Sequence, residues 1–351
     1  MAFAAIGKRL QSNIPSAKEE WNSGKKYIQW GDGNQFPEYL LTLYREVTTL
    51  RSIVEGAVNY TVGDEVTSNL PTERLNRCGE SARDLVRQMA FDYWLFGGFA
   101  LQVIRNNEGG IAEVYCQPMQ YIRWDKEGER YYYSEDWSRF ARFSATERPK
   151  FVPSMTDNKD TFYVVKNTRS GVYPEPLYLA ALKACEIERN IDTYHLNSIE
   201  NGFMGSYIFQ FNNGEPEDDD KREIERNINE KFAGSANAGR IMMLFNDNRD
   251  TGMDISKVEQ PDFADRYNSL AAHCRQQIFA SFHANPNLFG IPTENLGFNN
   301  EEYEQSFKLF NRTMIQPVQA MIVDALDYIF GVEGSITITP FSMEGATRVV
   351  E

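Results

Sequence analysis

Two histidines, His273 and His283, are the residues best suited by type to bind a metal ion or to act as a base. The apolar spacing of residues 262–284 predicts a helix, and both histidines fall on its polar face. Ten residues at 1.5 Å each separate them by about 15 Å, whereas the ligands of one zinc ion each lie about 2 Å from it. The two cannot share a metal ion on a straight helix, so we expect a surface or interface role. The third histidine, His195, stands alone on another predicted helix.

The rest of the sequence offers little chemistry. The motifs GxSxG, HExxH, GxxxxGK[ST] and GxGxxG are absent. Carboxylate pairs are frequent, but 50 Asp and Glu residues make such pairs uninformative. The run Tyr131-Tyr132-Tyr133 has the rings to stack on bases, but no basic groove accompanies it, and a half-buried strand explains it better. We therefore predict no catalytic residue, no metal site and no cofactor.

Composition and charge limit the class of protein. The chain has 351 residues, of which 42% are hydrophobic and 13% aromatic, enough for a large core in one to three domains. Its formal net charge is -14. An acidic chain repels nucleic acid, because DNA binding normally neutralises phosphates with Lys and Arg. DNA is therefore either not a ligand or a ligand that must slide without being held.

Cysteine usage and hydropathy indicate the compartment. The four cysteines, Cys78, Cys116, Cys185 and Cys274, lie far apart, with no CxxC and no metal-binding spacing. We predict buried free thiols in a reducing compartment. The N-terminus MAFAAIGKRLQS is too weakly apolar for a signal peptide. No run of 18 apolar residues is present to span a membrane.

The first half of the chain predicts helices followed by strands. Residues 1–36 are expected to be extended, and Pro37 opens a helix, with Gly63 ending it or its successor. A second helix is predicted over 80–96, stopped by Gly97 and Gly98. The segments FALQVIRN, AEVYCQP, YIRWD, RYYYSE and TFYVVKN then alternate with turns such as NNEGG and DKEG. The pattern predicts an α+β arrangement with a mostly antiparallel sheet.

Long helices organise the second half. A helix is predicted over 175–201, about 25 residues or roughly 37 Å, and another over 262–284. Between them, residues 203–256 predict a β–α–β insert built from SYIFQF, an acidic helix and GRIMMLF. The loop 285–299 leads to a third helix, to about Phe330, whose apolar stripe continues in phase through Pro317. A kinked helix is expected there, followed by a closing strand, GSITITPF.

The order of these segments resembles the portal proteins of tailed bacteriophages, in the siphovirus-like portal family. The resemblance is carried by YWLFGGFALQVIRNNEGGIAEVYCQP, YPEPLYLAALKACEIERNIDTYHLNSIENG, FAGSANAGRIMMLFN and RQQIFASFHANPNLFG. The following NNEE and the helix with a proline at its midpoint complete the match. It extends from about residue 37 to 335, and it rests on the order and spacing of the segments together.

The resemblance implies a portal-protein fold. It assigns 1–174 to an α+β wing, 175–202 and 257–284 to two long stem helices, and 203–256 to a small β–α–β clip. It makes 285–299 a tunnel loop, 300–331 a kinked wing helix, and 332–351 a C-terminal strand with a crown that is short or absent.

The resemblance also implies a ring, usually of twelve subunits, at one capsid vertex. Double-stranded DNA passes through the ring without sequence-specific binding during packaging and ejection. It also implies contacts with large terminase, a head-tail connector, and capsid and scaffold proteins, in the virion and without a membrane.

The resemblance also names candidate residues. In the tunnel loop the channel-lining candidates are Asn287, Leu288, Phe289, Gly290, Thr293, Glu294, Asn295, Leu296 and Gly297. The kink is expected at Pro317. The clip candidates are Tyr207, Phe209, Ile224, Ile228, Phe232, Asn237, Gly239 and Arg240. The family's VPP is replaced here by Ala284-Asn285-Pro286, and the loop lacks Lys and Arg, so any DNA contact is expected to be steric or transiently polar.

Two other functions fit part of the pattern. One is a different capsid-associated structural protein that lacks an axial channel. The other is an enzyme with its site near His283 and Glu294, which would need a base beside a nucleophile.

Overall fold

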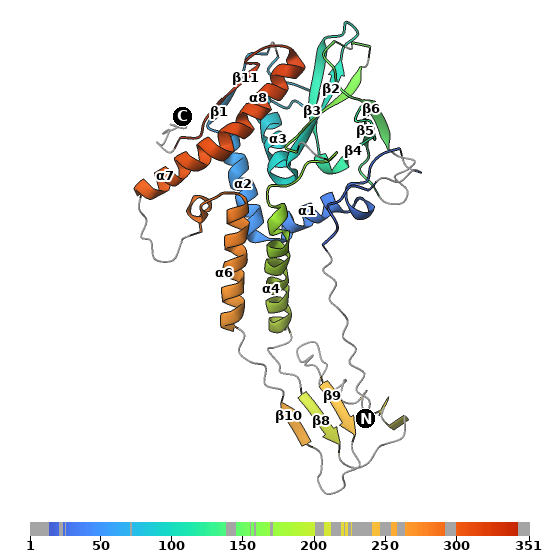
Figure 1. Ribbon diagram of the computed structural model, residues 1–351, viewed down its shortest axis with the longest axis vertical. Helices are drawn as coiled ribbons and strands as arrows, with labels where there is room; N and C mark the ends of the chain where they lie inside the picture. Colours follow the sequence, from blue (N-terminus) through green and yellow to red (C-terminus); the bar gives the residue numbers. More distant parts are fainter. Residues whose placement is uncertain are drawn as a thin grey trace. The chain divides into compact units, whose positions relative to one another are not determined.

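The computed structural model divides the chain into two compact units (Figure 1), residues 1–186 with 276–351 and residues 187–275. The structure describes residues 14–20, 24, 26–70, 72–137, 145–154, 156–157, 159–168, 171–200, 207–211, 219–220, 222–223, 226, 241–245, 254–257, 264–291 and 300–342.

Three helices form the centre of the first unit. The segment expected to begin with one helix at Pro37 divides into α1 (Phe36–Glu46) and α2 (Thr48–Val62), because Val47 between them is extended, with φ -104° and ψ 106°. Gly63 ends α2, as predicted. In α3 (Ala82–Phe96), Ser81 and Asp84 form a reciprocal capping box. Most of α3 is buried, so it is the central helix of this unit.

Six strands of the first unit make two antiparallel three-stranded sheets. One has the order β3 (Ile111–Gln117), β2 (Gly98–Arg105), β7 (Asp160–Lys166), and the other β4 (Ile122–Trp124), β5 (Arg130–Tyr133), β6 (Thr146–Pro149). The five predicted strands are confirmed, but β6 was not predicted, and two sheets replace the single one. Tyr131 and Tyr132 are 4% and 7% exposed, so both rings belong to the core.

Packing against the turn from α3 into β2 explains why the helix predicted from residue 175 begins several residues later. Gly97 has φ 86°, and a Cβ there would lie 2.1 Å from the carbonyl oxygen of Glu175, so residues after Pro174 are held against this turn. Tyr178 is fully buried and donates a hydrogen bond to Leu95 O at 3.0 Å. The helix predicted from residue 175 therefore begins at Leu182, and α4 (Leu182–Glu200) is about 28 Å long.

The second unit contains most of α4 and α6 (Ala264–Ser281) and a three-stranded sheet. Within it, Tyr194 of α4 and Tyr267 of α6 contact each other with ring centroids 4.9 Å apart. Strand β8 (Tyr207–Phe211) pairs parallel with β9 (Ile241–Phe245), and residues 219–220, 222–223 and 226 between them are helical, as a β–α–β unit requires. A third strand, β10 (Asp254–Lys257), pairs antiparallel with β8 and was not predicted.

The C-terminal helix runs without interruption through its proline. It comprises α7 (Asn300–Phe310), a π-helical segment η6 (Asn311–Ile315) and α8 (Gln316–Phe330). Proline removes one backbone donor, and its ring crowds the carbonyl four residues earlier. The wider π turn directly before Pro317 accommodates both effects. The predicted closing strand, β11 (Ile336–Thr339), pairs with β1 (Glu65–Ser68).

We predict that Pro317→Ala converts η6 to α-helix and straightens the axis of the combined helix. The side chain of Pro317 is exposed, so the change removes the steric cause without opening the core. The measurement is a structure of the variant, with the exposed neighbour changed in Gln316→Ala as control. An unchanged π segment and axis in Pro317→Ala would contradict the kink argument.

Candidate functional site

The loop predicted to carry the function begins where α6 ends. The helix stops at Ser281, and His283 adopts φ 53°, the left-handed conformation that closes many helices. Its N–H donates to Ala280 O at 3.1 Å, and the N–H of Ala284 donates to Phe279 O at 3.0 Å. The prediction that His273 and His283 share one helix face is therefore wrong, because His283 lies beyond the helix.

The first turn of the loop is well defined. Asn285 caps the short 3-10 helix η5 (Pro286–Phe289), and its Oδ1 accepts a hydrogen bond from the N–H of Asn287 at 3.1 Å. The Nδ2 of Asn285 donates to Ser306 Oγ in α7 at 3.1 Å. Gly290 ends η5 with φ 77°. The root of the loop, residues 285–290, is thus tied to the helix that follows it.

Helix α2 holds the same root from the other side. The hydroxyl of Tyr60 donates a hydrogen bond to Leu288 O at 2.7 Å. Phe289 lies over Gly56, where a Cβ would come within 2.6 Å of the Phe289 ring. Only a glycine leaves room for this ring on the helix surface.

An aromatic cluster surrounds the Tyr60 contact. The Tyr60 ring lies 5.3 Å from Phe307, 5.3 Å from Phe341, 6.0 Å from Phe289 and 6.4 Å from Phe310, measured between centroids. Burial raises the pKa of Tyr60, with a further contribution from Tyr303. The hydroxyl therefore stays protonated and remains a donor to the loop.

The structure describes four of the nine residues predicted to line the channel. Leu288 is a wrong prediction, because its side chain is 5% exposed and packs into the core. Asn287 and Phe289 are half-buried and Gly290 is exposed. Thr293, Glu294, Asn295, Leu296 and Gly297 lie outside the described residues. Of the clip candidates, Tyr207 and Phe209 lie in β8, and the others are also outside the described residues: Ile224, Ile228, Phe232, Asn237, Gly239 and Arg240.

Sequence reasoning missed Gly56 and Tyr60, the two residues of α2 that hold the loop root. A signal for Gly56 existed. Glycine in the interior of a helix costs about 1 kcal/mol relative to alanine, and a glycine kept there indicates close approach by another group. Nothing in the local pattern around Tyr60 shows that its partner lies 228 residues away.

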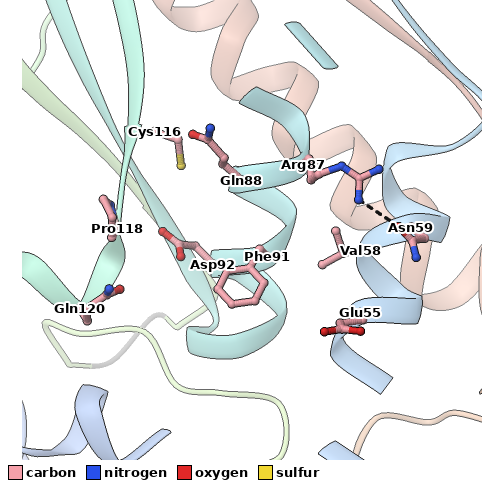
Figure 2. Close-up of a pocket in the computed structure, with 10 residues that line it drawn as sticks. All are labelled: Glu55, Val58, Asn59, Arg87, Gln88, Phe91, Asp92, Cys116, Pro118 and Gln120. Carbon is pink, nitrogen blue, oxygen red and sulfur yellow. Dashed lines mark hydrogen bonds between the residues drawn. The ribbon is translucent and has the colours of Figure 1, made fainter. Parts of the chain in front are cut away.

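A second feature of the same unit is a cavity of about 590 Å³ between α2, α3 and β3 (Figure 2). Asp92 in its wall is 4% exposed and accepts a hydrogen bond from the Met119 N–H at 3.0 Å. Burial raises the pKa of the Asp92 carboxyl well above its usual range, against the smaller opposing effect of that hydrogen bond. Burial likewise raises the pKa of the Cys116 thiol, helped by Asp92 and Glu80. Burial therefore favours the neutral form of both groups.

The cysteines are free, as predicted, but they are not all buried. Cys185 and Cys274 are buried, Cys116 is half-buried and Cys78 is exposed. Among the residues that the structure describes, no cluster of three or more His, Cys, Asp or Glu side chains is placed to hold a metal ion. No helix in the described part of the chain has the length and apolar content needed to cross a membrane.

Comparison with known families gives one match that covers most of the chain. Residues 63–343 match the family described as "Phage portal protein". A comparison with curated proteins finds no significant match.

Solved structures share the fold at low sequence identity. A chain in the neck of a native gene transfer agent particle, computed with C12 symmetry, is 16% identical, with a TM-score of 0.57 over 95% of this chain and 88% of that chain. A chain in the virion of that type of particle is 17% identical, with a TM-score of 0.55 over 86% and 83%. An HK97-family phage portal protein from Corynebacterium diphtheriae is 11% identical, with a TM-score of 0.51 over 82% and 88%.

We predict that Gly56→Ala loosens the loop root although it improves helix propensity. Alanine in an open helix position would stabilise the protein by about 1 kcal/mol, whereas here its Cβ displaces the Phe289 ring. The expected result is a lower unfolding temperature and faster amide exchange in residues 285–290, measured by calorimetry and by hydrogen exchange with mass spectrometry. Ser52→Ala, one turn earlier in α2, is the control. A Gly56→Ala variant that is more stable, with unchanged exchange in 285–290, would show that Phe289 does not need the glycine.

Proposed function

Because the chain belongs to the phage portal protein family, we propose that its subunits form a ring at one capsid vertex, around a channel for double-stranded DNA. The single observation that carries the proposal is the family match over residues 63–343. The mixed helix and strand fold, shared with an HK97-family portal protein, supports it. The site supports a structural role, and we propose no catalytic one.

Exposed apolar side chains support assembly into a ring. Four of the large apolar side chains that are exposed lie on α4 and α6 in the second unit: Ile187 at 38%, Tyr194 at 39%, Leu196 at 56% and Leu270 at 39%. Exposed apolar side chains of this size are available for contact with another molecule. A ring supplies such a contact, because each subunit presents one patch to a different patch on its neighbour. The C12 symmetry of the gene transfer agent neck supports twelve subunits.

We assign the segments their roles on the same basis. Residues 1–174 form the wing, α4 and α6 the stem, and β8, β9 and β10 the clip. The loop 285–299 faces the channel, and α7 with α8 forms the wing helix behind it. The ring would occupy the virion and contact large terminase, a head-tail connector, and capsid and scaffold proteins.

The charge of the chain supports a channel in which DNA slides. At a net charge of -14 per subunit, a ring repels the phosphate backbone. No Lys or Arg occurs between Arg275 and Lys308, so the loop cannot hold DNA through ion pairs with phosphates. Its contacts with DNA would be steric or transiently polar, and such contacts do not arrest a moving duplex.

Imaging of the assembled protein tests the proposal. Native mass spectrometry should show a ring of about twelve subunits, as the family resemblance implies, and negative-stain averages should show a central hole wide enough for duplex DNA. A protein that stays monomeric under all conditions, including with its capsid partners, would refute the ring. A ring closed to duplex DNA would favour a capsid-associated structural protein without a channel.

We also predict that replacing Gly290 and Gly297 with valine lowers DNA packaging several-fold and leaves ring assembly intact. Gly290 has φ 77°, which a β-branched residue adopts only under strain, and no atom lies within 4 Å of a Cβ built there. The change therefore restricts the loop without disturbing the core. Nuclease-protected DNA in assembled particles is the measurement. Gly79→Val is the matched control, since Gly79 also has positive φ (78°) and open space around it. Normal packaging in the double variant would show that DNA transport does not need these two glycines.

A further inference from the structure

The cavity beside Asp92 is shaped to receive a side chain. It has a volume of about 590 Å³ and opens to the surface between α2 and α3. Figure 2 shows the Asp92 carboxyl and the Cys116 sulfur directed inward, with Phe91 and Val58 toward the α2 side. The apolar part of the lining comes from Val58, Phe91 and Pro118.

Two buried groups in the wall of this cavity disfavour charge. Burial raises the pKa of the Asp92 carboxyl and of the Cys116 thiol, so it favours the neutral form of each. Covering a polar pocket is costly mainly when an ionised group loses its contact with water. Because burial favours the neutral forms of Asp92 and Cys116, an incoming apolar side chain adds little of this cost. The charged residues Glu55 and Arg87 are already engaged: Glu55 accepts from Arg51 and Tyr44, and Arg87 donates to Asn59 at 3.0 Å.

The cavity and the helix α7 lie on different flanks of α2. Gly56 and Tyr60 contact the loop root and α7, whereas Glu55, Val58 and Asn59 line the cavity. At 100° per residue, these two groups of positions point roughly 130° apart around the helix axis. One side of the subunit thus carries α7 and another side carries the cavity, and both lie beside the same turns of α2.

The outer surface of α7 carries a fitting side chain. Leu309 is 65% exposed, the highest value among the large apolar side chains in the described part of the chain. Its neighbours Phe307 and Phe310 are buried against α2, so Leu309 points away from the subunit. Lys308 and Glu304 beside it form an exposed ion pair at 3.7 Å, and Arg312 is exposed one turn further on.

We propose that the Leu309 side chain of one subunit inserts into the cavity of the next subunit in the ring. In a ring, each subunit contacts its two neighbours through two different surfaces. Leu309 and the cavity lie on different sides of one subunit, as such a heterologous contact requires. Charged side chains of both signs flank the leucine and line the cavity, so the two surfaces can be complementary in charge: Glu304, Lys308 and Arg312 on α7, and Glu55 and Arg87 at the cavity. The inference rests on the proposed ring, and it names which surfaces of the subunit meet.

A native cysteine allows a direct test. In a Cys78→Ser background, which removes the exposed thiol, Leu309→Cys would place a new thiol beside Cys116 of the neighbouring subunit. Oxidation of the assembled ring with copper phenanthroline should produce a ladder of disulfide-linked subunits on a non-reducing gel, and a reductant should abolish it. Adding Cys116→Ser should remove the ladder. Val332→Cys, at another exposed apolar position, is the matched control and should not link to Cys116.

A second variant tests the energetic role of the contact. Leu309→Asp would bring a charge next to the buried Asp92 carboxyl, where burial disfavours charge, and should lower the fraction of protein in rings at least tenfold in native mass spectrometry, with Val332→Asp as control. If wild-type rings form, but Leu309→Cys gives no ladder and Leu309→Asp assembles normally, the docking inference is overturned and the proposed function stands. If the wild-type chain forms no rings under any condition, the proposed function fails, and the docking inference fails with it.

Discussion

The hydrogen bond from Tyr60 to the Leu288 carbonyl, inside its aromatic cluster, is the constraint on which the rest of the first unit depends. It joins α2 to a segment more than two hundred residues later in the sequence. Phe310 extends the cluster to Trp94 of α3, with centroids 6.4 Å apart, and Phe282 at the end of α6 stacks on Tyr178 at 5.2 Å. Each ring buries a large apolar area, and the protonated Tyr60 hydroxyl satisfies a backbone carbonyl that packing would otherwise leave without a donor. Four helices and the loop root therefore share one packed centre.

This arrangement fixes the root of the loop, residues 285–290, against α2 and α7. The chain leaves the cluster at Ile291 and returns to a described helix at Asn300. A force on the loop would act on η5 at one end and on α7 at the other, and both contact Tyr60. In a portal ring, a displacement caused by passing DNA would thus reach α2. The same helix lines the cavity that we assign to the neighbouring subunit, so one element links the channel side to the subunit contact.

The acidic residues lie in different electrostatic environments. The chain is strongly acidic, and ionised carboxylates at its surface suit a channel that repels phosphate. Asp92 is different, because its burial raises the pKa of the carboxyl and favours the neutral form. The acidic residues thus lie in two kinds of environment, and their number in the sequence does not distinguish these environments.

The sequence by itself determined the elements whose signals are local. The capping box at Ser81, the stop at Gly97, the alternation in β2, β3 and β7 and the apolar stripe through Pro317 all act within a few residues, and the order of these segments was enough to indicate the family. Only the tertiary structure decided the break at Val47, the late start of α4, the third strand β10, the burial of Leu288 and the place of His283 beyond its helix. The late start of α4 and the burial of Leu288 depend on partners far away in the chain, Glu175 against Gly97 and Tyr60 against Leu288, as does the packing of Phe289 against Gly56. Local propensity differs by about 1 kcal/mol or less between most residues. Contacts of this kind outweigh it, and a linear pattern does not show which residues will meet.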